Sequence, residues 1–250
     1  MRQSPTETQK YEVFSTSKYS VGLMNDFGSD TPCGDMGSRV RADGKAMLHG
    51  RLYAGIDPSG GRSSWGFAVV SWLPGLCRII EAWESRPSRV YSSLESLANI
   101  PVNAVGVDAP VNVLREAGPW RECELEALRK GARLLPLNTP GMMRLSRNGL
   151  SIFRLFEEAG VPIVETHPTS ILSSLDLSNT AYRRRHLLDA IISAIAVGAF
   201  FEEPASVRAA LGGCILIYSV DEHIGRECGL SGKKQVPEET IKNVLKEKRT

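Results

Sequence analysis

Four short apolar runs follow one another early in this chain, and the lengths of their connections restrict how they can pair. The runs are RLYAGID (51–57), WGFAVVSW (65–72), LCRIIEAW (76–83) and VNAVGVD (102–108). Short turns join the first three, which predicts an antiparallel meander. A predicted helix at residues 92–99 separates the third run from the fourth, so the fourth strand can lie parallel to the first.

Helices and strands alternate in the prediction for the rest of the chain. Helices are expected at 120–131, 150–160 and 182–201, a strand is expected at 161–167, and 213–219 is a candidate for one more strand. The segment 134–149 is hard to assign. This order of elements predicts an α/β fold with a mixed five-stranded sheet and helices on its faces.

The chain of 250 residues is long enough to bury one large core. Residues 1–50 lack periodicity and are rich in Ser, Thr, Gly and Asp, which is typical of a disordered N-terminal extension. We expect the folded domain at residues 51–228. The lysine-rich residues 229–250 are expected to form a basic C-terminal tail or a peripheral helix.

No stretch approaches the roughly 18 to 20 apolar residues of a membrane span, and the N-terminus lacks the apolar core of a signal peptide. A cytoplasmic protein without membrane partners is therefore expected. The cysteines are scattered without any C-x-x-C pair, which predicts ordinary reduced thiols rather than a zinc site or a disulfide framework. They are Cys33, Cys77, Cys123, Cys214 and Cys228.

The charge of the predicted domain argues against a strong nonspecific nucleic-acid binder. Residues 51–228 carry 18 basic and 19 acidic side chains, so this region is close to neutral. Nearly all the basic residues are arginine, which suits bidentate contact with phosphate, although codon bias explains the same preference.

Two of the apolar runs end in the same way, with a single aspartate before a turn. Asp57 ends the run GID and is followed by PSG, and Asp108 ends GVD and is followed by AP. In parallel neighbouring strands these carboxylates would lie side by side at the carboxyl edge of the sheet, where α/β folds bind ligands. Adjacent carboxylates need a proton or a cation between them, and hard oxygen ligands select Mg²⁺ or Mn²⁺. The alternative is that each aspartate only caps a turn.

Three further residues are candidates for the same site. Asp189 lies in the strongest predicted helix, where the small side chains of Ala190 and Ser193 would let the helix approach the sheet and bring a third carboxylate to the ion. An ordinary polar helix face with an Arg185 partner explains Asp189 equally well. Glu165 and His167 end the predicted fifth strand, where Glu165 would ligate metal and His167 would contact phosphate or move a proton. A histidine before proline is also a common structural hydrogen-bonding residue.

Six ordered motifs resemble a known but uncharacterised family, domain of unknown function 429, which is regarded as ribonuclease H-like. The motifs are GIDPSG…WGFAVV, GVDAPVN, RECE, PGMMRL, VETHPTSIL and DAIISAIAV, and together they cover roughly residues 51 to 200. The first strand and the last helix also look like those of RuvC-type junction resolvases. The resemblance implies a sheet ordered 3-2-1-4-5 with strand two antiparallel and a carboxylate cluster at its parallel edge.

The motifs also carry site residues over from that family. Asp57 matches the first-strand aspartate, Asp108 the fourth-strand acid and Asp189 the acid of the last helix, while Glu165 and His167 match an E-x-H-P signature of unestablished role. In ribonuclease H-like nucleases such carboxylates hold two divalent ions about 4 Å apart. No second acid lies close to Asp189 in the last helix, which leaves one or two ions open.

Three functions follow from these observations. The leading prediction is a nuclease that hydrolyses phosphodiester bonds of a nucleic-acid substrate with Mg²⁺ or Mn²⁺ as cofactor. An actin-like or sugar-kinase-type nucleotide binder would use GIDPSGGRSS around a phosphate, although such enzymes duplicate the domain. The third reading is a non-catalytic module that binds a partner through the same edge. Substrate and oligomeric state stay open.

Overall fold

The structure is a computed structural model that describes residues 50–61, 63–111, 118–175 and 185–230. All described residues lie in one compact unit. The predicted N-terminal extension and most of the predicted C-terminal tail lie outside the described residues, so the division into three regions stays a prediction. None of the helices in the described part is long and apolar enough to cross a membrane.

Seven strands form one sheet in the order β3-β2-β1-β4-β5-β7-β6. The strands are β1 (Arg51–Asp57), β2 (Trp65–Leu73), β3 (Leu76–Ser85), β4 (Ala104–Val107), β5 (Ile163–Thr166), β6 (Val207–Ala210) and β7 (Leu216–Val220). β2 is antiparallel to β1 and β3, whereas β1, β4, β5 and β7 run parallel. The predicted ribonuclease H-like order 3-2-1-4-5 is therefore confirmed, and β7 and β6 extend the sheet by two strands.

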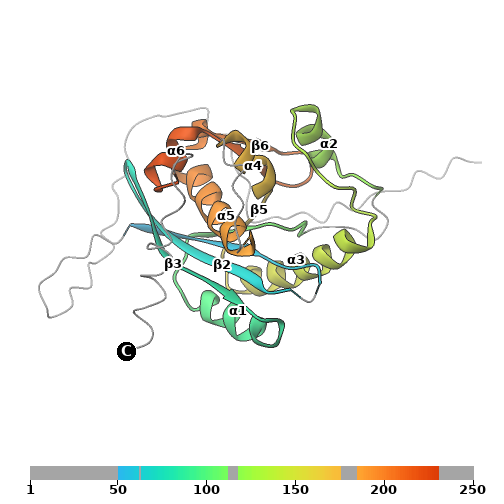
Figure 1. The fold of residues 1–250 in the computed structure, drawn as a ribbon, viewed down its shortest axis with the longest axis horizontal. Coiled ribbons are helices and arrows are strands. Elements are labelled where there is room, and N and C mark those ends of the chain that lie inside the picture. Colours follow the sequence, from blue (N-terminus) through green and yellow to red (C-terminus); the bar gives the residue numbers. More distant parts are fainter. Residues whose placement is uncertain (1–49, 62, 112–117, 176–184, 231–250) are drawn as a thin grey trace, which may run out of the picture. The chain divides into compact units, whose positions relative to one another are not determined.

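Six α-helices and two short 3₁₀ turns are described, and helices cover both faces of the sheet (Figure 1). They are η1 (Pro87–Arg89), α1 (Val90–Ala98), α2 (Glu122–Arg129), α3 (Pro140–Glu158), α4 (Pro168–Ser174), α5 (Arg185–Glu202), η2 (Pro204–Ser206) and α6 (Glu222–Glu227). Most of the segment 134–149 belongs to α3. This helix starts where Thr139 caps it, because the Thr139 hydroxyl accepts a hydrogen bond from the backbone N–H of Met142 at 3.4 Å.

The sheet separates two apolar cores. Tyr53 of β1 belongs to the core under α4, α5 and α6, whereas its neighbour Ala54 belongs to the core under α1 and α3. Alternate residues of a strand point to opposite faces, so the position of a side chain along β1 or β4 decides which helices it meets.

Helix α5 lies directly against the backbone of the sheet. A Cβ atom added to Gly55 would lie 1.9 Å from the carbonyl oxygen of Ala190, and one added to Gly106 would lie 2.3 Å from that of Ser193. Gly55 and Gly106 are register partners in the parallel pair of β1 and β4. The predicted close approach through small helix residues is confirmed, and glycines in the strands make it possible.

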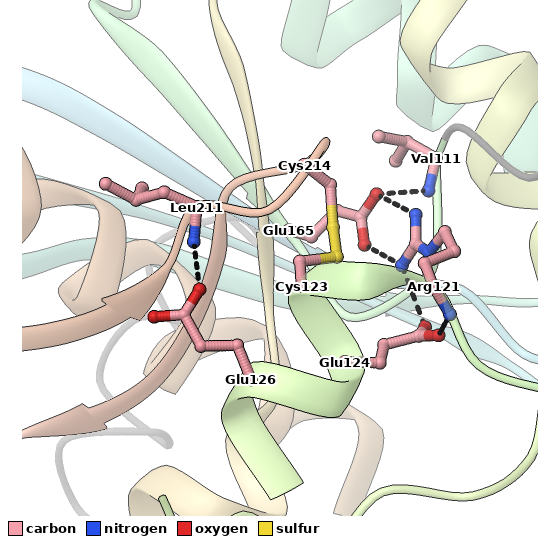
Figure 2. The surroundings of a disulfide bond; sticks show 8 residues. All are labelled: Val111, Arg121, Cys123, Glu124, Glu126, Glu165, Leu211 and Cys214. Carbon is pink, nitrogen blue, oxygen red and sulfur yellow. Dashed lines mark hydrogen bonds and ion pairs between the residues drawn. A yellow bond between two sulfur atoms is a disulfide. The ribbon is translucent and has the colours of Figure 1, made fainter. Parts of the chain in front are cut away.

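The prediction of reduced cysteines is wrong for four of the five. Cys77 in β3 is bonded to Cys228 after α6, and Cys123 in α2 is bonded to Cys214 before β7 (Figure 2). The partners are 151 and 91 residues apart, so no local spacing reveals them. Because disulfides are rare in the cytosol, the pairs lend no support to a cytoplasmic location, which stays a prediction. Cys33 lies outside the described residues.

Candidate metal centre

Three aspartates from three different elements converge at the carboxyl edge of the parallel strands. Asp57 is the last residue of β1, Asp108 directly follows β4, and Asp189 lies one turn into α5. One carboxylate oxygen of each lies within 4.8 Å of those of the other two. The backbone N–H of Asp108 donates to the carbonyl of Ile56 at 2.9 Å, which continues the strand pairing to the point where both carboxylates emerge. The structure therefore brings together the three aspartates that the sequence analysis named.

The repeated pattern Gly-x-Asp explains why they face the same way. Gly55 lies two residues before Asp57, and Gly106 two residues before Asp108, so each glycine shares a face with its aspartate. That face is the one covered by α5, since α5 rests on both glycines. The glycines thus admit the helix that carries Asp189, a signal present in GID and GVD that the sequence analysis did not use.

The cluster is poorly solvated and electrostatically crowded. Asp57 and Asp189 are only 5% and 4% exposed, and Asp108 is partly buried. Burial raises the pKa of all three carboxyls above the usual value for aspartate. The negative charges of Asp57 and Asp189 raise the pKa of Asp108 further, and burial with the Asp57 charge raises the pKa of Asp189 to about 6. Without a cation, the three carboxyls therefore oppose one another's ionisation.

Two basic residues at the start of α5 offset part of this charge. The imidazole Nδ1 of His186 lies 2.7 Å from an Asp57 carboxylate oxygen, and this hydrogen bond raises the pKa of His186. The guanidinium of Arg185 donates to Asp189 at 3.4 Å and to the hydroxyl of Thr169 at 3.1 Å. The expected Arg185 partner of Asp189 is present, in addition to the carboxylate cluster. His186 was not among the predicted site residues, although it lies one turn before Asp189 on the same helix.

The donor set fits a divalent cation. Its three ligands are carboxylates, the hard donors that Mg²⁺ and Mn²⁺ prefer. Asp189 Oδ1 is buried and has no hydrogen-bond partner among the described residues, which is costly unless something else binds it. At a Mg²⁺ ion, neighbouring ligand oxygens are about 2.9 Å apart and opposite ones about 4.2 Å apart, so the three carboxylates would draw closer together on binding one ion.

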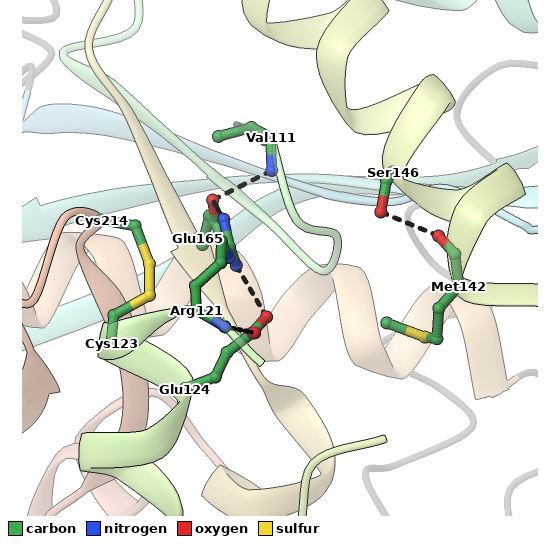
Figure 3. A network of polar contacts seen from close by, with 8 residues as sticks. All are labelled: Val111, Arg121, Cys123, Glu124, Met142, Ser146, Glu165 and Cys214. Carbon is green, nitrogen blue, oxygen red and sulfur yellow. Dashed lines mark hydrogen bonds and ion pairs between the residues drawn. A yellow bond between two sulfur atoms is a disulfide. The ribbon is translucent and has the colours of Figure 1, made fainter. Parts of the chain in front are cut away.

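Glu165 is not part of this group. It pairs in register with Val107, which belongs to the core on the α3 side of the sheet, so Glu165 points away from α5. There the guanidinium of Arg121 donates to both Glu165 oxygens, at 2.8 and 2.6 Å, and the backbone N–H of Val111 donates at 3.0 Å (Figure 3). The next residue, Thr166, faces α5 and bonds to Ser193 at 2.7 Å. Because neighbouring residues of a strand face opposite sides of the sheet, Glu165 lies on the α3 side, whereas Thr166 lies on the α5 side with the aspartates.

His167 also lies outside the cluster. It caps α4, where its Nδ1 accepts a hydrogen bond from the backbone N–H of Ser170 at 3.3 Å. Burial, together with the charge of Arg185, lowers the pKa of His167 to about 4, so the ring is neutral at pH 7. This is the structural role that a histidine before proline often has. Catalytic roles for Glu165 and His167 stay predictions.

A cavity of about 190 Å³ adjoins the aspartates, and Asp108 belongs to both. Glu165, Arg121 and His167 line one side of it, and residues of α3 line the other. The structure thus brings all five predicted site residues to one edge of the sheet, three in the carboxylate cluster and Glu165 and His167 in the lining of the neighbouring cavity.

Comparisons with known proteins leave the family open. No protein-family model matches the chain, and no curated protein matches it. Among solved structures, T. thermophilus RuvC in complex with Holliday junction substrate has 21% sequence identity and a TM-score of 0.34, covering 58% of this chain and 90% of that chain. A Thermus thermophilus RuvC structure has 18% identity and a TM-score of 0.37, covering 61% of this chain and 96% of that one. Likenesses of this size do not establish a family, so membership in the family of unknown function stays a prediction.

Proposed function

We propose that this chain is a divalent-metal-dependent nuclease that hydrolyses phosphodiester bonds. The observation that carries this proposal is the convergence of Asp57, Asp108 and Asp189 on one point, with a buried Asp189 oxygen that has no described partner. Three carboxylates placed this closely need a cation to be ionised together at neutral pH. The carboxyl edge of parallel strands is where α/β sheets bind their ligands.

Each residue has a distinct role in the proposed reaction. Asp57, Asp108 and Asp189 would hold Mg²⁺ or Mn²⁺, which when bound lowers the pKa of water and neutralises charge on the phosphate. His186 orients the Asp57 carboxylate through their 2.7 Å hydrogen bond, as partners of metal ligands commonly do. Arg185 balances charge at Asp189 without reaching deep into the cluster, since its side chain is 69% exposed.

Arginines of α3 are suited to contact the nucleic-acid backbone. Arg144 and Arg147 lie on the exposed side of α3 and border a groove with Gly60 and Gly61, in the turn that follows Asp57. Arg144 donates to the carbonyl of Gly60 at 2.8 Å, which fixes the turn beside the helix. Contacts between arginines and phosphates position a nucleic acid without reading its sequence. A local pair of arginines is consistent with a domain that is neutral as a whole.

The proposal is tested with a panel of single-stranded, duplex, hybrid and branched nucleic acids incubated with Mg²⁺ or Mn²⁺. We expect cleavage of at least one member, loss of cleavage in EDTA, and a loss of at least about a hundredfold in Asp57→Asn. Asp221→Asn is the matched control, because Asp221 is exposed and its side chain makes no capping bond to α6. Folded wild-type protein that cleaves no member of the panel would contradict the proposal.

The same wild-type protein distinguishes the proposed nuclease from the other two predicted functions. A nucleotide-binding ATPase would hydrolyse ATP or be stabilised by it, with no cleavage of nucleic acid. A non-catalytic module would bind nucleic acid or a protein without responding to Mn²⁺.

A further inference from the structure

The cavity beside the aspartates has the size and position of a subsite for part of a substrate. Its volume of about 190 Å³ is room for a ring system. Leu135 lines it and is 66% exposed, so the cavity opens to solvent there. Asp108 connects it to the carboxylate cluster.

The cavity lining combines apolar and polar groups. The apolar wall consists mainly of aliphatic side chains of Pro110, Leu134, Leu135, Met142, Leu145 and Leu216, of which Leu216 is the register partner of Glu165 and lies next to the polar groups. The polar wall holds the guanidinium of Arg121 between Glu124 and Glu165, and Figure 3 shows this group across from Met142 of α3. Apolar walls with a few fixed polar groups are typical of sites for small rings.

The polar wall is rich in hydrogen-bond acceptors. Two carboxylates, 4% and 3% exposed, face one guanidinium, so Glu124, Glu165 and Arg121 together carry one net negative charge. A carboxylate has about four acceptor sites, and the described contacts of Glu124 use two of them, with Nη2 and the backbone N–H of Arg121. A negative, acceptor-rich wall disfavours a phosphate group and favours a ligand that donates N–H groups.

His167 supplies one donor to the same cavity. Its Nδ1 lies 2.8 Å from the hydroxyl and 3.3 Å from the backbone nitrogen of Ser170, and in the tautomer in which Nδ1 accepts from both, the proton of the neutral ring resides on Nε2. Within the described part of the chain, no residue accepts a hydrogen bond from this nitrogen. The cavity therefore presents acceptors at Glu124 and Glu165 and a donor at His167, the mixture that pairs with the edge of a nucleobase.

We propose that this cavity binds one nucleobase of the nucleic-acid substrate and prefers a base that carries an exocyclic amino group. The inference rests on the proposed nuclease function and names a substrate element for that site. The apolar wall would cover the ring, the carboxylates would accept from the amino group, and His167 would donate to a ring nitrogen or carbonyl. Uracil and thymine have no amino group; their ring N3–H is flanked by two carbonyl oxygens, which the carboxylates would repel. Because the cavity shares Asp108 with the cluster, base binding selects which phosphate reaches the metal.

The test uses calorimetric titration of AMP, CMP, GMP and UMP with Ca²⁺ present, which needs no cleavage. We expect the best of the three amino-bearing nucleotides to bind at least about tenfold more tightly than UMP. Leu135→Glu places a further negative charge at the cavity mouth, and Leu135→Trp fills the mouth without charge; both should abolish the difference. Leu76→Glu is the matched control, because Leu76 is a 51% exposed leucine at the turn between β2 and β3.

The outcomes separate this proposal from the nuclease itself. Equal affinity for the four nucleotides, no binding of any, or an unchanged preference in both folded Leu135 variants would overturn the base subsite. Cleavage of nucleic acid without base preference would leave the nuclease standing and the subsite refuted. Preference for amino-bearing nucleotides without any cleavage would support the cavity and refute the nuclease.

Discussion

Among single residues, the charge on the three clustered aspartates depends on what lies between them. Burial raises their pKa values, and in the absence of a cation each negative charge also opposes the next. The folded chain then binds protons more tightly than the unfolded chain. Such a site lowers stability in exchange for the capacity to bind an ion, as functional sites often do.

This predicts an unusual dependence of stability on pH. Because the pKa of Asp189 rises from 3.8 to about 6 on folding, the Asp189 carboxyl should destabilise the metal-free protein, relative to an Asp189→Asn variant, increasingly as pH rises through this window. In EDTA at pH 7, Asp108→Asn should be more stable than wild type by about 1–2 kcal/mol, since it removes one repelling charge. Adding Mg²⁺ should stabilise wild type and not the variant. Urea unfolding of wild type and Asp189→Asn at several pH values measures this, and a stability difference between the two that stays constant between pH 4 and 6 in EDTA would contradict it.

The residue scale also shows what a sequence can predict. Asp57, Asp108 and Asp189 were found because two strands end alike and one helix has small residues. Alternation along β5 predicts which residues share a face with Glu165. It does not show whether the aspartates of the other strands lie on that side of the sheet, so the prediction placed Glu165 beside them. Only the pairing of Glu165 with Val107 in the sheet fixes that relation.

At the level of elements, the contact between α5 and the sheet determines where Asp189 lies. The helix rests on Gly55 and Gly106. The position of the Asp189 carboxylate therefore depends on the absence of a side chain at these two strand positions. Elements with long periodic patterns, such as β1, β2 and α5, were predicted close to their bounds. The short β6 and α4 were missed, because four to seven residues without a strong pattern depend on neighbours that lie far away in sequence.

A substitution at Gly55 tests the contact between α5 and the sheet. In Gly55→Ala the added Cβ would lie 1.9 Å from the Ala190 carbonyl, so α5 must move. We expect a loss of about 1–3 kcal/mol in the free energy of unfolding and weaker Mn²⁺ binding in the protein that remains folded. Gly61→Ala is the matched control, because nothing lies within 4 Å of its added Cβ. Equal Mn²⁺ affinity in Gly55→Ala and Gly61→Ala would show that the position of α5 at the metal site does not depend on this contact.

Across the domain as a whole, two disulfides join regions that are far apart in sequence. Cys77–Cys228 closes a segment of 151 residues between β3 and the end of α6. Cys123–Cys214 fastens α2, with Arg121 at its start, to the segment before β7. Pairings over such distances depend on the finished fold and leave no spacing pattern, which is why the sequence analysis did not predict them.

Removal of the longer link should therefore lower global stability. Cys77→Ser with Cys228→Ser is expected to reduce the free energy of unfolding by about 2–5 kcal/mol, since the open chain has more conformational entropy when unfolded. Denaturant unfolding of the double variant against wild type measures the loss. Thiol titration of unfolded, unreduced wild type should find Cys77 and Cys228 blocked, and finding these two thiols free would contradict the pairing.

The central claim is that Asp57, Asp108 and Asp189 hold a divalent cation, and a crystal soaked in Mn²⁺ tests it most directly. Anomalous scattering should show a Mn²⁺ ion with an oxygen of each aspartate at about 2.0–2.2 Å. In a crystal of Asp108→Asn under the same conditions, this peak should be weaker or absent. A wild-type crystal without Mn²⁺ among these carboxylates, or with the ion bound elsewhere, would contradict the account.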